Sequence, residues 1–247
     1  MVRETTKENK VKIAFANTHL PGIILRERNV AAQLRQLPNL SVISDPDWIG
    51  CNYTAHRACR ETLRLAELDP EVTHVCVLSD DMELSDNFAA NVTGAVAAVP
   101  DKVISLFCMR KTLEDAAAKN KRWGVSHIGV YGGSSIWPVA WMKDYLIWEA
   151  KYVREEYPYD DRRMGGWLVL HSKMPVWYTV PSLLQHLGAN QSMMGHSNYT
   201  RISKTYKKDL PVLEWQDVTN PYKMAGGSDW LPEIMANLIN WQGVTEA

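Results

Sequence analysis

Residues 74–81 read HVCVLSDD, an apolar and β-branched run that ends in a serine and two aspartates. Short apolar runs of this kind are typical of strands that are buried on both faces of a sheet. The pattern predicts a central strand over 74–78, with Ser79, Asp80 and Asp81 just beyond its carboxyl end. In open α/β sheets, ligands bind at that edge.

The patterns on either side of this strand alternate between strand and helix periodicity. Such alternation predicts an α/β fold: a doubly wound, mostly parallel sheet with helices on both faces. We expect a helix after Asp81 to start near Ser85 or Asp86, either of which could cap it. The expected strands lie at 11–16, 41–44, 74–78 and 103–109, and the helices at about 30–37, 53–68 and 85–99.

The chain changes character after residue 109. Residues 110–122 are charged and predict a loop with a short helix, and 123–139 are rich in Gly, Ser and aromatic residues. Further helices are expected over 140–156 and from about Asp160 to Leu170, with a strand over 176–180. The tail from about 197 is polar, then shows a last amphipathic segment, and we expect it to wrap the domain without a second core.

The composition is that of an ordinary globular protein. The chain has 247 residues, 46% of them hydrophobic, and a net charge of −1, which excludes a uniformly basic nucleic-acid binder but leaves room for a local basic patch. The N-terminus MVRETTKENK is polar, and the longest uncharged run, 123–142, is interrupted by Gly and Pro. We therefore expect no secretory signal, no membrane span and a cytoplasmic location, with the four cysteines buried and reduced.

The adjacent carboxylates of Asp80 and Asp81 are the sharpest chemical feature. Two such charges repel unless positive charge lies close by, and a divalent cation carrying a diphosphate would supply it. The alternative is a solvated turn that caps the next helix. His186, between apolar Leu184 and Leu187, is expected to face inward, as a core residue or as a ligand. Asp81 and His186, with diphosphate oxygens and water, would form an octahedral Mn²⁺ or Mg²⁺ site.

Asp160 and Asp161 open the segment YDDRRMGGWLVL (159–170). They fit either the exposed start of a helix, with local ion pairing to the two arginines that follow, or a general base at the mouth of a pocket. In the second reading Gly165-Gly166 would let a substrate approach the backbone. The segment 132–135 (GGSS) is either a flexible turn or a loop that offers backbone donors and a hydroxyl to a sugar or phosphate.

Several nucleotide and esterase signatures are absent. The sequence contains no GxxxxGK[ST], no GxGxxG after a strand and no GxSxG. The order and spacing of its motifs resemble those of the GT-A-fold, nucleotide-sugar-dependent glycosyltransferases over about 11–195. The motifs that carry the resemblance are VKIAFA (11–16), VCVLSDDMELSDNF (75–88), YGGSSIWPVAWM (131–142), YDDRRMGGWLVL (159–170) and VPSLLQHLG (180–188).

The resemblance implies a role for each motif. Ser79-Asp80-Asp81 corresponds to the DxD-type motif of the family but reads Ser-Asp-Asp, with Asp81 on the metal and Asp80 near the donor ribose or the metal. His186 completes the metal site, and Asp160 or Asp161 is the acceptor-side base of an inverting enzyme. The remaining contacts to the nucleotide-sugar donor are implied for Ala16, Asn17, Thr18, Arg57, Arg60, Gly132, Gly133 and Ser134.

The implied activity is metal-dependent transfer of a sugar from a nucleoside-diphosphate sugar, with UDP as the expected nucleotide, to an acceptor hydroxyl. Residues 1–195 would be the catalytic domain, with a donor half at about 11–109 and an acceptor half at about 110–195. Residues 196–247 would be a C-terminal extension packed on it.

The small, signal-free form is similar to that of virus-encoded members, some of which glycosylate hydroxymethylated pyrimidines in viral DNA; such an enzyme would work in the host cytoplasm. Charge runs are usually just solvated faces. The alternative is that the two basic segments, with nearby tryptophans, bind a DNA acceptor. The alternatives are a glycan or small-molecule acceptor, a sugar nucleotidyltransferase, a metal-dependent phosphoesterase, and a binding module without catalysis. The basic residues are Lys102, Arg110, Lys111, Lys119, Lys121, Arg122, Arg201, Lys204, Lys207 and Lys208, and the tryptophans are Trp123, Trp137 and Trp141.

Overall fold

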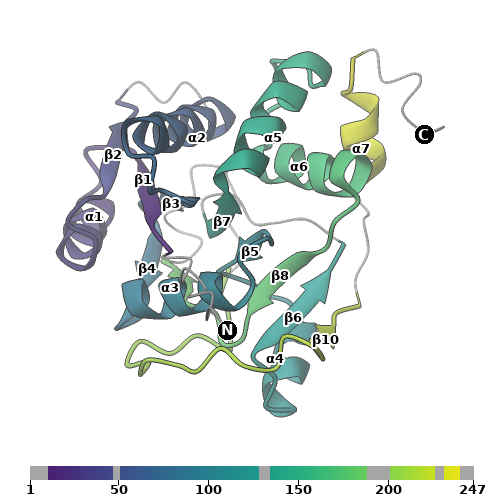
Figure 1. Ribbon diagram of the computed structural model, residues 1–247. Coiled ribbons are helices and arrows are strands. Elements are labelled where there is room, and N and C mark those ends of the chain that lie inside the picture. The colour runs from purple at the N-terminus through teal and green to yellow at the C-terminus, as the bar shows by residue number, and fades with distance from the viewer. Residues whose placement is uncertain (1–10, 47–50, 128–133, 188–200, 226–230, 240–247) are drawn as a thin grey trace, which may run out of the picture.

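The computed structural model describes residues 11–46, 51–127, 134–187, 201–225 and 231–239 (Figure 1). In these ranges the chain forms an eight-stranded sheet and a separate two-stranded one. The large sheet runs in the order β10 (Tyr222–Lys223), β6 (Trp123–Ser126), β8 (Val176–Thr179), β5 (Ile104–Ser105), β7 (Ser134–Pro138), β3 (His74–Ser79), β1 (Ile13–His19) and β2 (Ser41–Ser44). The small sheet joins β4 (Met82–Leu84) to β9 (Leu184–His186).

The large sheet is mixed but mostly parallel. Within the described residues, β1 pairs parallel with β2 and β3, β5 with β8, and β6 with β10. The strand β7 runs antiparallel between β3 and β5, and β6 runs antiparallel to β8. The helices are α1 (Ile24–Gln36), α2 (Cys51–Leu68), α3 (Phe88–Ala98), α4 (Lys111–Ala118), α5 (Val139–Tyr152), α6 (Asp160–Gly166), the π-helix η1 (Trp167–Ser172) and α7 (Leu231–Ala236).

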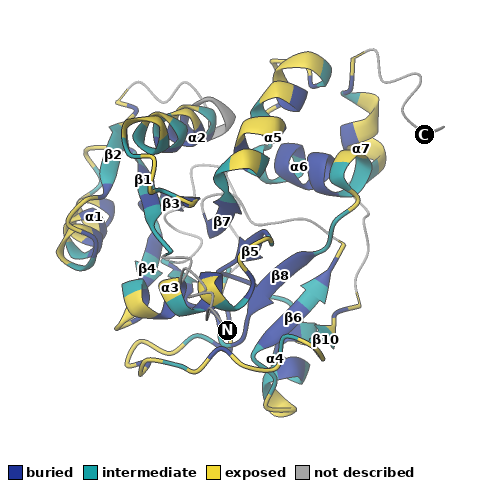
Figure 2. Ribbon diagram, viewed as in Figure 1, coloured by how far each residue is buried: buried dark blue, intermediate teal, exposed yellow. Residues whose placement is uncertain are grey.

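The central strand β3 separates two hydrophobic cores. Val75 and Val77 belong to the core that includes residues of α2, α5 and α6, whereas Cys76 and Leu78 belong to the core that includes residues of α3. Figure 2 shows that the strand β8 is also buried. Because side chains alternate along a strand, a strand that is apolar at every position must have packed layers on both faces. The α/β class and the two covered faces predicted from the sequence are confirmed.

The strand β7 was not predicted, because its Gly-rich approach and its serines are typical of a turn. Ser134 and Ser135 are completely buried at the centre of the sheet, and the hydroxyl of Ser135 accepts a hydrogen bond from Trp137 Nε1 at 2.9 Å. The expected strand over 103–109 shortens to the two residues of β5. The neighbour of β3 on this side is therefore β7, and it runs antiparallel to β3, whereas a parallel strand was expected.

The helix after Asp81 begins later than expected. The helix α3 starts at Phe88, and its N-cap residue is Asn87, not Ser85 or Asp86. The backbone NH groups of Ser85 and Asp86 donate to the carbonyls of Leu183 and Lys208. None of the described helices is long and apolar enough to cross a membrane.

The described part of the tail packs on both cores. Leu210 and Trp215 belong to the core beside α3, and Ile234 in α7 packs against α6 in the other core.

Candidate active site

The pairing of β4 with β9 brings two distant parts of the chain together at the end of β3. Met82 lies opposite His186 in this antiparallel pair, and the NH of Leu187 donates to the carbonyl of Asp81 at 2.8 Å. As a result His186 Nε2 lies 3.2 Å from Asp81 Oδ2. The imidazole is buried, whereas the Asp81 side chain is 15% exposed, so the carboxylate keeps some access to solvent.

The Asp81–His186 pair fits a divalent cation. Two ligand atoms about 2.1 Å from an octahedral ion and at right angles to each other lie about 3 Å apart, close to the separation found here. A carboxylate oxygen suits Mn²⁺ and Mg²⁺, and an imidazole nitrogen is a ligand of divalent transition-metal ions. Among the described residues no group of three His, Cys, Asp or Glu side chains converges in this way. With no third side chain of this kind in the described part of the chain, diphosphate oxygens and water would complete the coordination of the ion.

The charge of Asp81 is stabilised by its neighbours. Burial would raise its pKa, but the hydrogen bond from His186 and the charges of His186, Arg26 and Arg201 outweigh it and hold the pKa below the ordinary value. A carboxylate that stays ionised is the state in which it binds metal ions.

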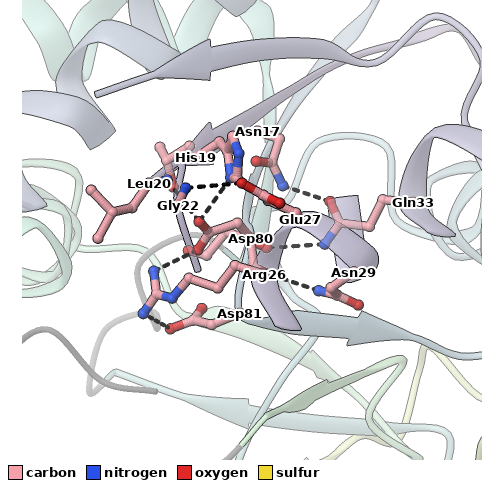
Figure 3. A network of polar contacts seen from close by, with 12 residues as sticks. Asn17, His19, Leu20, Gly22, Arg26, Glu27, Asn29, Gln33, Asp80 and Asp81 are labelled. Carbon is pink, nitrogen blue, oxygen red and sulfur yellow. Dashed lines mark hydrogen bonds and ion pairs between the residues drawn. The ribbon is translucent and has the colours of Figure 1, made fainter. Parts of the chain in front are cut away.

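Asp80 has a different environment from the one expected of a metal ligand. Its Oδ2 accepts from the NH of Leu20 at 2.7 Å and lies 3.1 Å from His19 Nδ1, and its Oδ1 accepts from Arg26 at 2.7 Å (Figure 3). The side chain is 3% exposed. Burial raises its pKa although Arg26 and the NH of Leu20 oppose the shift. Both oxygens of Asp80 therefore contact protein donors, which come from His19 and Leu20 at the end of β1 and from Arg26 in α1. These contacts join the two segments to the end of β3.

A buried polar face of α1 holds this arrangement in place. Asn29 Nδ2 donates to the carbonyls of Asp80 and Met82, and Gln33 Nε2 donates to those of Ser79 and Met82. These bonds satisfy the backbone of the turn that carries both aspartates. The residues of this face were not singled out in the sequence, although Arg26, Asn29 and Gln33 recur at helical spacing beside Val30. Polar residues on the same face of the helix as apolar ones could have indicated buried hydrogen-bonding partners.

Asp160 and Asp161 lie in the first turn of α6. Burial, with a contribution from the charge of Asp161, raises the pKa of Asp160 to about 7. Burial also raises the pKa of Asp161, whose Oδ1 accepts from the backbone NH of Arg162 at 2.8 Å. Arg163 does not pair with these carboxylates but turns inward to Glu149 at 2.9 Å. Burial therefore shifts the pKa values of both carboxyls upward, toward that of a general base that works near neutral pH.

The charge of Arg201 affects three of the four aspartates, namely Asp81, Asp160 and Asp161. This charge opposes the rise that burial causes in the pKa values of Asp160 and Asp161. It also contributes to the lowered pKa of Asp81. The position of this segment is set by a reciprocal pair of hydrogen bonds between Gln185 and Ser203, next to His186. The sequence showed Arg201 only as one member of a basic cluster.

The residues implied for donor binding are placed unevenly. Ala16 and Asn17 are completely buried, and only Thr18 of that segment is partly exposed. Ser134 pairs with Leu78 in the sheet, so it lies beside the end of β3. Arg57 and Arg60 are exposed on α2, and the arginine that pairs with both Asp80 and Asp81 is Arg26. Gly132 and Gly133 lie outside the described residues.

Some expectations about substrate contacts are wrong. A Cβ on Gly166 would lie 3.0 Å from Ile234 and 3.4 Å from Trp148, so this glycine allows α7 to pack closely and is not open to a substrate. Trp123 and Trp137 are completely buried and cannot stack on a ligand. The described cysteine side chains, Cys59, Cys76 and Cys108, are buried and free, as expected.

Neither a family model nor a curated protein sequence matches the chain. Among solved structures, A197 from STIV aligns with a TM-score of 0.46 and 10% identity over 81% of this chain and 98% of that one. A glycosyltransferase involved in the glycosylation of the major capsid of PBCV-1 aligns with a TM-score of 0.33 and 14% identity, over 61% and 72%. Because both TM-scores lie below 0.5, neither likeness carries a conclusion about what this chain does.

Proposed function

We propose that this protein is a metal-dependent glycosyltransferase that uses a nucleoside-diphosphate sugar as donor. The observation that carries the proposal is the approach of His186 Nε2 to Asp81 Oδ2, 3.2 Å apart at the carboxyl end of β3. Asp81 and His186 would hold the divalent cation, which when bound neutralises negative charge on the leaving diphosphate. UDP is the nucleotide to be tested first, as the sequence resemblance implies.

The chain's own residues would carry the proton and part of the charge. Asp160 accepts the proton of the acceptor hydroxyl as that oxygen forms a bond to the anomeric carbon, while the bond from that carbon to the diphosphate oxygen breaks. Arg201, within electrostatic reach of both acidic sites, would offset charge that develops on the diphosphate. Attack from the face opposite the leaving group inverts the configuration of the sugar.

The class of acceptor has to be considered separately. The expectation of a DNA acceptor used basic segments and tryptophans, but Lys204 pairs with Glu114, Lys208 pairs with Glu83, and Trp123 is completely buried. These observations remove part of the argument for nucleic acid, and the proposal therefore defines the acceptor only as a compound that carries a hydroxyl. Salt-sensitive binding of duplex DNA would add support for a DNA acceptor, and no binding at low salt would remove it.

The test of the proposal is product formation. Purified protein is incubated with a UDP-sugar panel, Mn²⁺ and candidate acceptors that include glycans, small alcohols and hydroxymethylated DNA, and products are read by mass spectrometry. The proposal expects a mass increase of one sugar residue and release of UDP, both lost on removal of the metal with EDTA. Formation of UMP and sugar 1-phosphate instead would indicate a phosphoesterase that hydrolyses the donor. Conversion of the UDP-sugar to UTP and sugar 1-phosphate on addition of pyrophosphate would indicate a nucleotidyltransferase.

A further inference from the structure

The guanidinium of Arg26 lies between the two carboxylates at the end of β3. One nitrogen is 2.7 Å from Asp80 Oδ1 and the other is 3.5 Å from Asp81 Oδ2, and the side chain is 6% exposed (Figure 3). A guanidinium can serve two acids at once because its donors form a rigid fork. The two contacts are unequal, since 2.7 Å is a strong charge-assisted hydrogen bond and 3.5 Å is beyond a good one.

Arg26 is therefore held firmly by one acid and loosely by the other. Asp80 is buried, and its oxygens also accept from Leu20 and contact His19, so its geometry is fixed by several partners. Asp81 Oδ2 is the atom that both Arg26 and His186 approach. A cation that binds this oxygen would have to compete with Arg26 for it.

We infer that Arg26 is a positioning residue that remains on Asp80 and gives up Asp81 Oδ2 when a divalent cation and an anionic diphosphate bind together. The inference rests on the proposed function, because it takes Asp81 and His186 as the cation ligands. Like charges repel at short range, so the guanidinium opposes the cation when it binds alone. The negative charge of a diphosphate attracts both the guanidinium and the cation. The diphosphate therefore offsets their repulsion, and its own binding is coupled to that of the cation.

The inference predicts that Arg26 weakens the binding of Mn²⁺ alone and strengthens the effect of UDP on it. Free Mn²⁺ is measured by electron paramagnetic resonance during titration, without nucleotide and then with UDP. Because Arg26→Met alone would leave Asp80 buried without its cation, the main variant is Arg26→Met with Asp80→Asn. We expect this variant to bind Mn²⁺ alone about tenfold more tightly and UDP to improve its affinity much less than in the wild type.

Two further variants complete the test. Arg26→Lys keeps a cation beside Asp80 but cannot serve both acids; it also covers the case in which the double variant does not fold, and we expect its Mn²⁺ affinity to rise severalfold. Arg64→Met removes an exposed arginine that pairs with Glu61 on α2 and should leave both titrations unchanged. Wild-type values in the folded Arg26 variants would overturn the inference. Absence of Mn²⁺ binding in the wild type even with UDP would overturn the proposed function instead.

Discussion

His186 Nε2 and Asp81 Oδ2 lie 3.2 Å apart because the antiparallel pairing of β9 with β4 places His186 opposite Met82. The contact therefore depends on backbone pairing between distant parts of the chain, not on flexible side chains alone. Since β4 follows Asp81 directly, the position of the imidazole relative to the carboxylate is fixed as soon as the two strands pair.

The first prediction concerns His186→Gln. Loss of the imidazole should weaken Mn²⁺ binding in the presence of UDP by at least about tenfold, because a metal-ligand contact is lost. The measurement is the Mn²⁺ titration described above. His171→Gln is the matched control, since that histidine lies on η1 and pairs with the exposed Asp144. Equal affinities for His186→Gln and wild type would contradict the assignment of this ligand.

The second prediction concerns pH and Asp160. If Asp160 is the base, turnover should rise with pH and level off above about 7, because burial raises the pKa of this carboxyl to about 7 and only its ionised form accepts a proton. Asp160→Asn should reduce turnover by about 10²–10⁴-fold. A wild-type rate that does not change between pH 5 and 8 would contradict this role.

The same raised pKa predicts an opposite trend in stability. The folded state favours protonated Asp160, so its stabilising contribution is complete below the unfolded pKa, near 3.8, and is lost as pH rises through about 7. The free energy of unfolding of the wild type should therefore fall relative to that of Asp160→Asn between about pH 4 and 7. Denaturant titrations at several pH values measure the difference, and a constant difference would show that the pKa of Asp160 is not raised.

The third prediction concerns Arg201→Gln. The charge of Arg201 opposes the rise that burial causes in the pKa of Asp160. Removal of this charge should therefore move the pH dependence of turnover to higher pH. It should also weaken UDP binding, with a smaller effect for Arg201→Lys, which keeps the charge. Isothermal titration with UDP and Mn²⁺ measures the second effect. Lys207→Gln, another position in the same basic segment, is the comparison. Loss of affinity in both variants to the same extent would indicate general electrostatics and not a role for Arg201.

The fourth prediction tests the support beneath α6. Glu149 is buried between Arg163 and His56, so Arg163→Met should lower the free energy of unfolding by about 3–5 kcal/mol. The double variant with Glu149→Leu should recover part of that loss, because no carboxylate is then left buried without its arginine. Urea titrations give both values. A cost below about 1 kcal/mol for the single variant would contradict a structural role for this ion pair.

The order of strands and helices could be predicted wherever the periodicity is local and strong. Residues 41–44 form β2 as expected, and the apolar run from His74 forms β3. The strand β7 could not be predicted in this way, because Ser134 and Ser135 are buried only after the neighbouring strands enclose them. Tertiary packing decides such a segment, and its local sequence favours a turn.

The site could be predicted in part. The end of β3 follows from the pattern alone, and the association of His186 with Asp81 follows from the family resemblance. The environment of Asp80 depends on Arg26, which lies on the inward face of α1, where a single sequence gives only a faint polar stripe. Arg201 has no local signal, because the contact between Gln185 and Ser203 that positions it is long-range.

The most direct measurement of the central claim is the thermal stability of the wild type and Asp81→Asn with UDP, Mn²⁺, both or neither. The account predicts that UDP raises the melting temperature of the wild type only with Mn²⁺, by the equivalent of about 2.7 kcal/mol when the ligand is at 100 times its dissociation constant. It predicts no such shift for Asp81→Asn, whereas Asp101→Asn, at an exposed carboxylate beside Lys102, should behave like the wild type. A shift of equal size in Asp81→Asn, or a wild type that UDP and Mn²⁺ together leave unchanged, would contradict it.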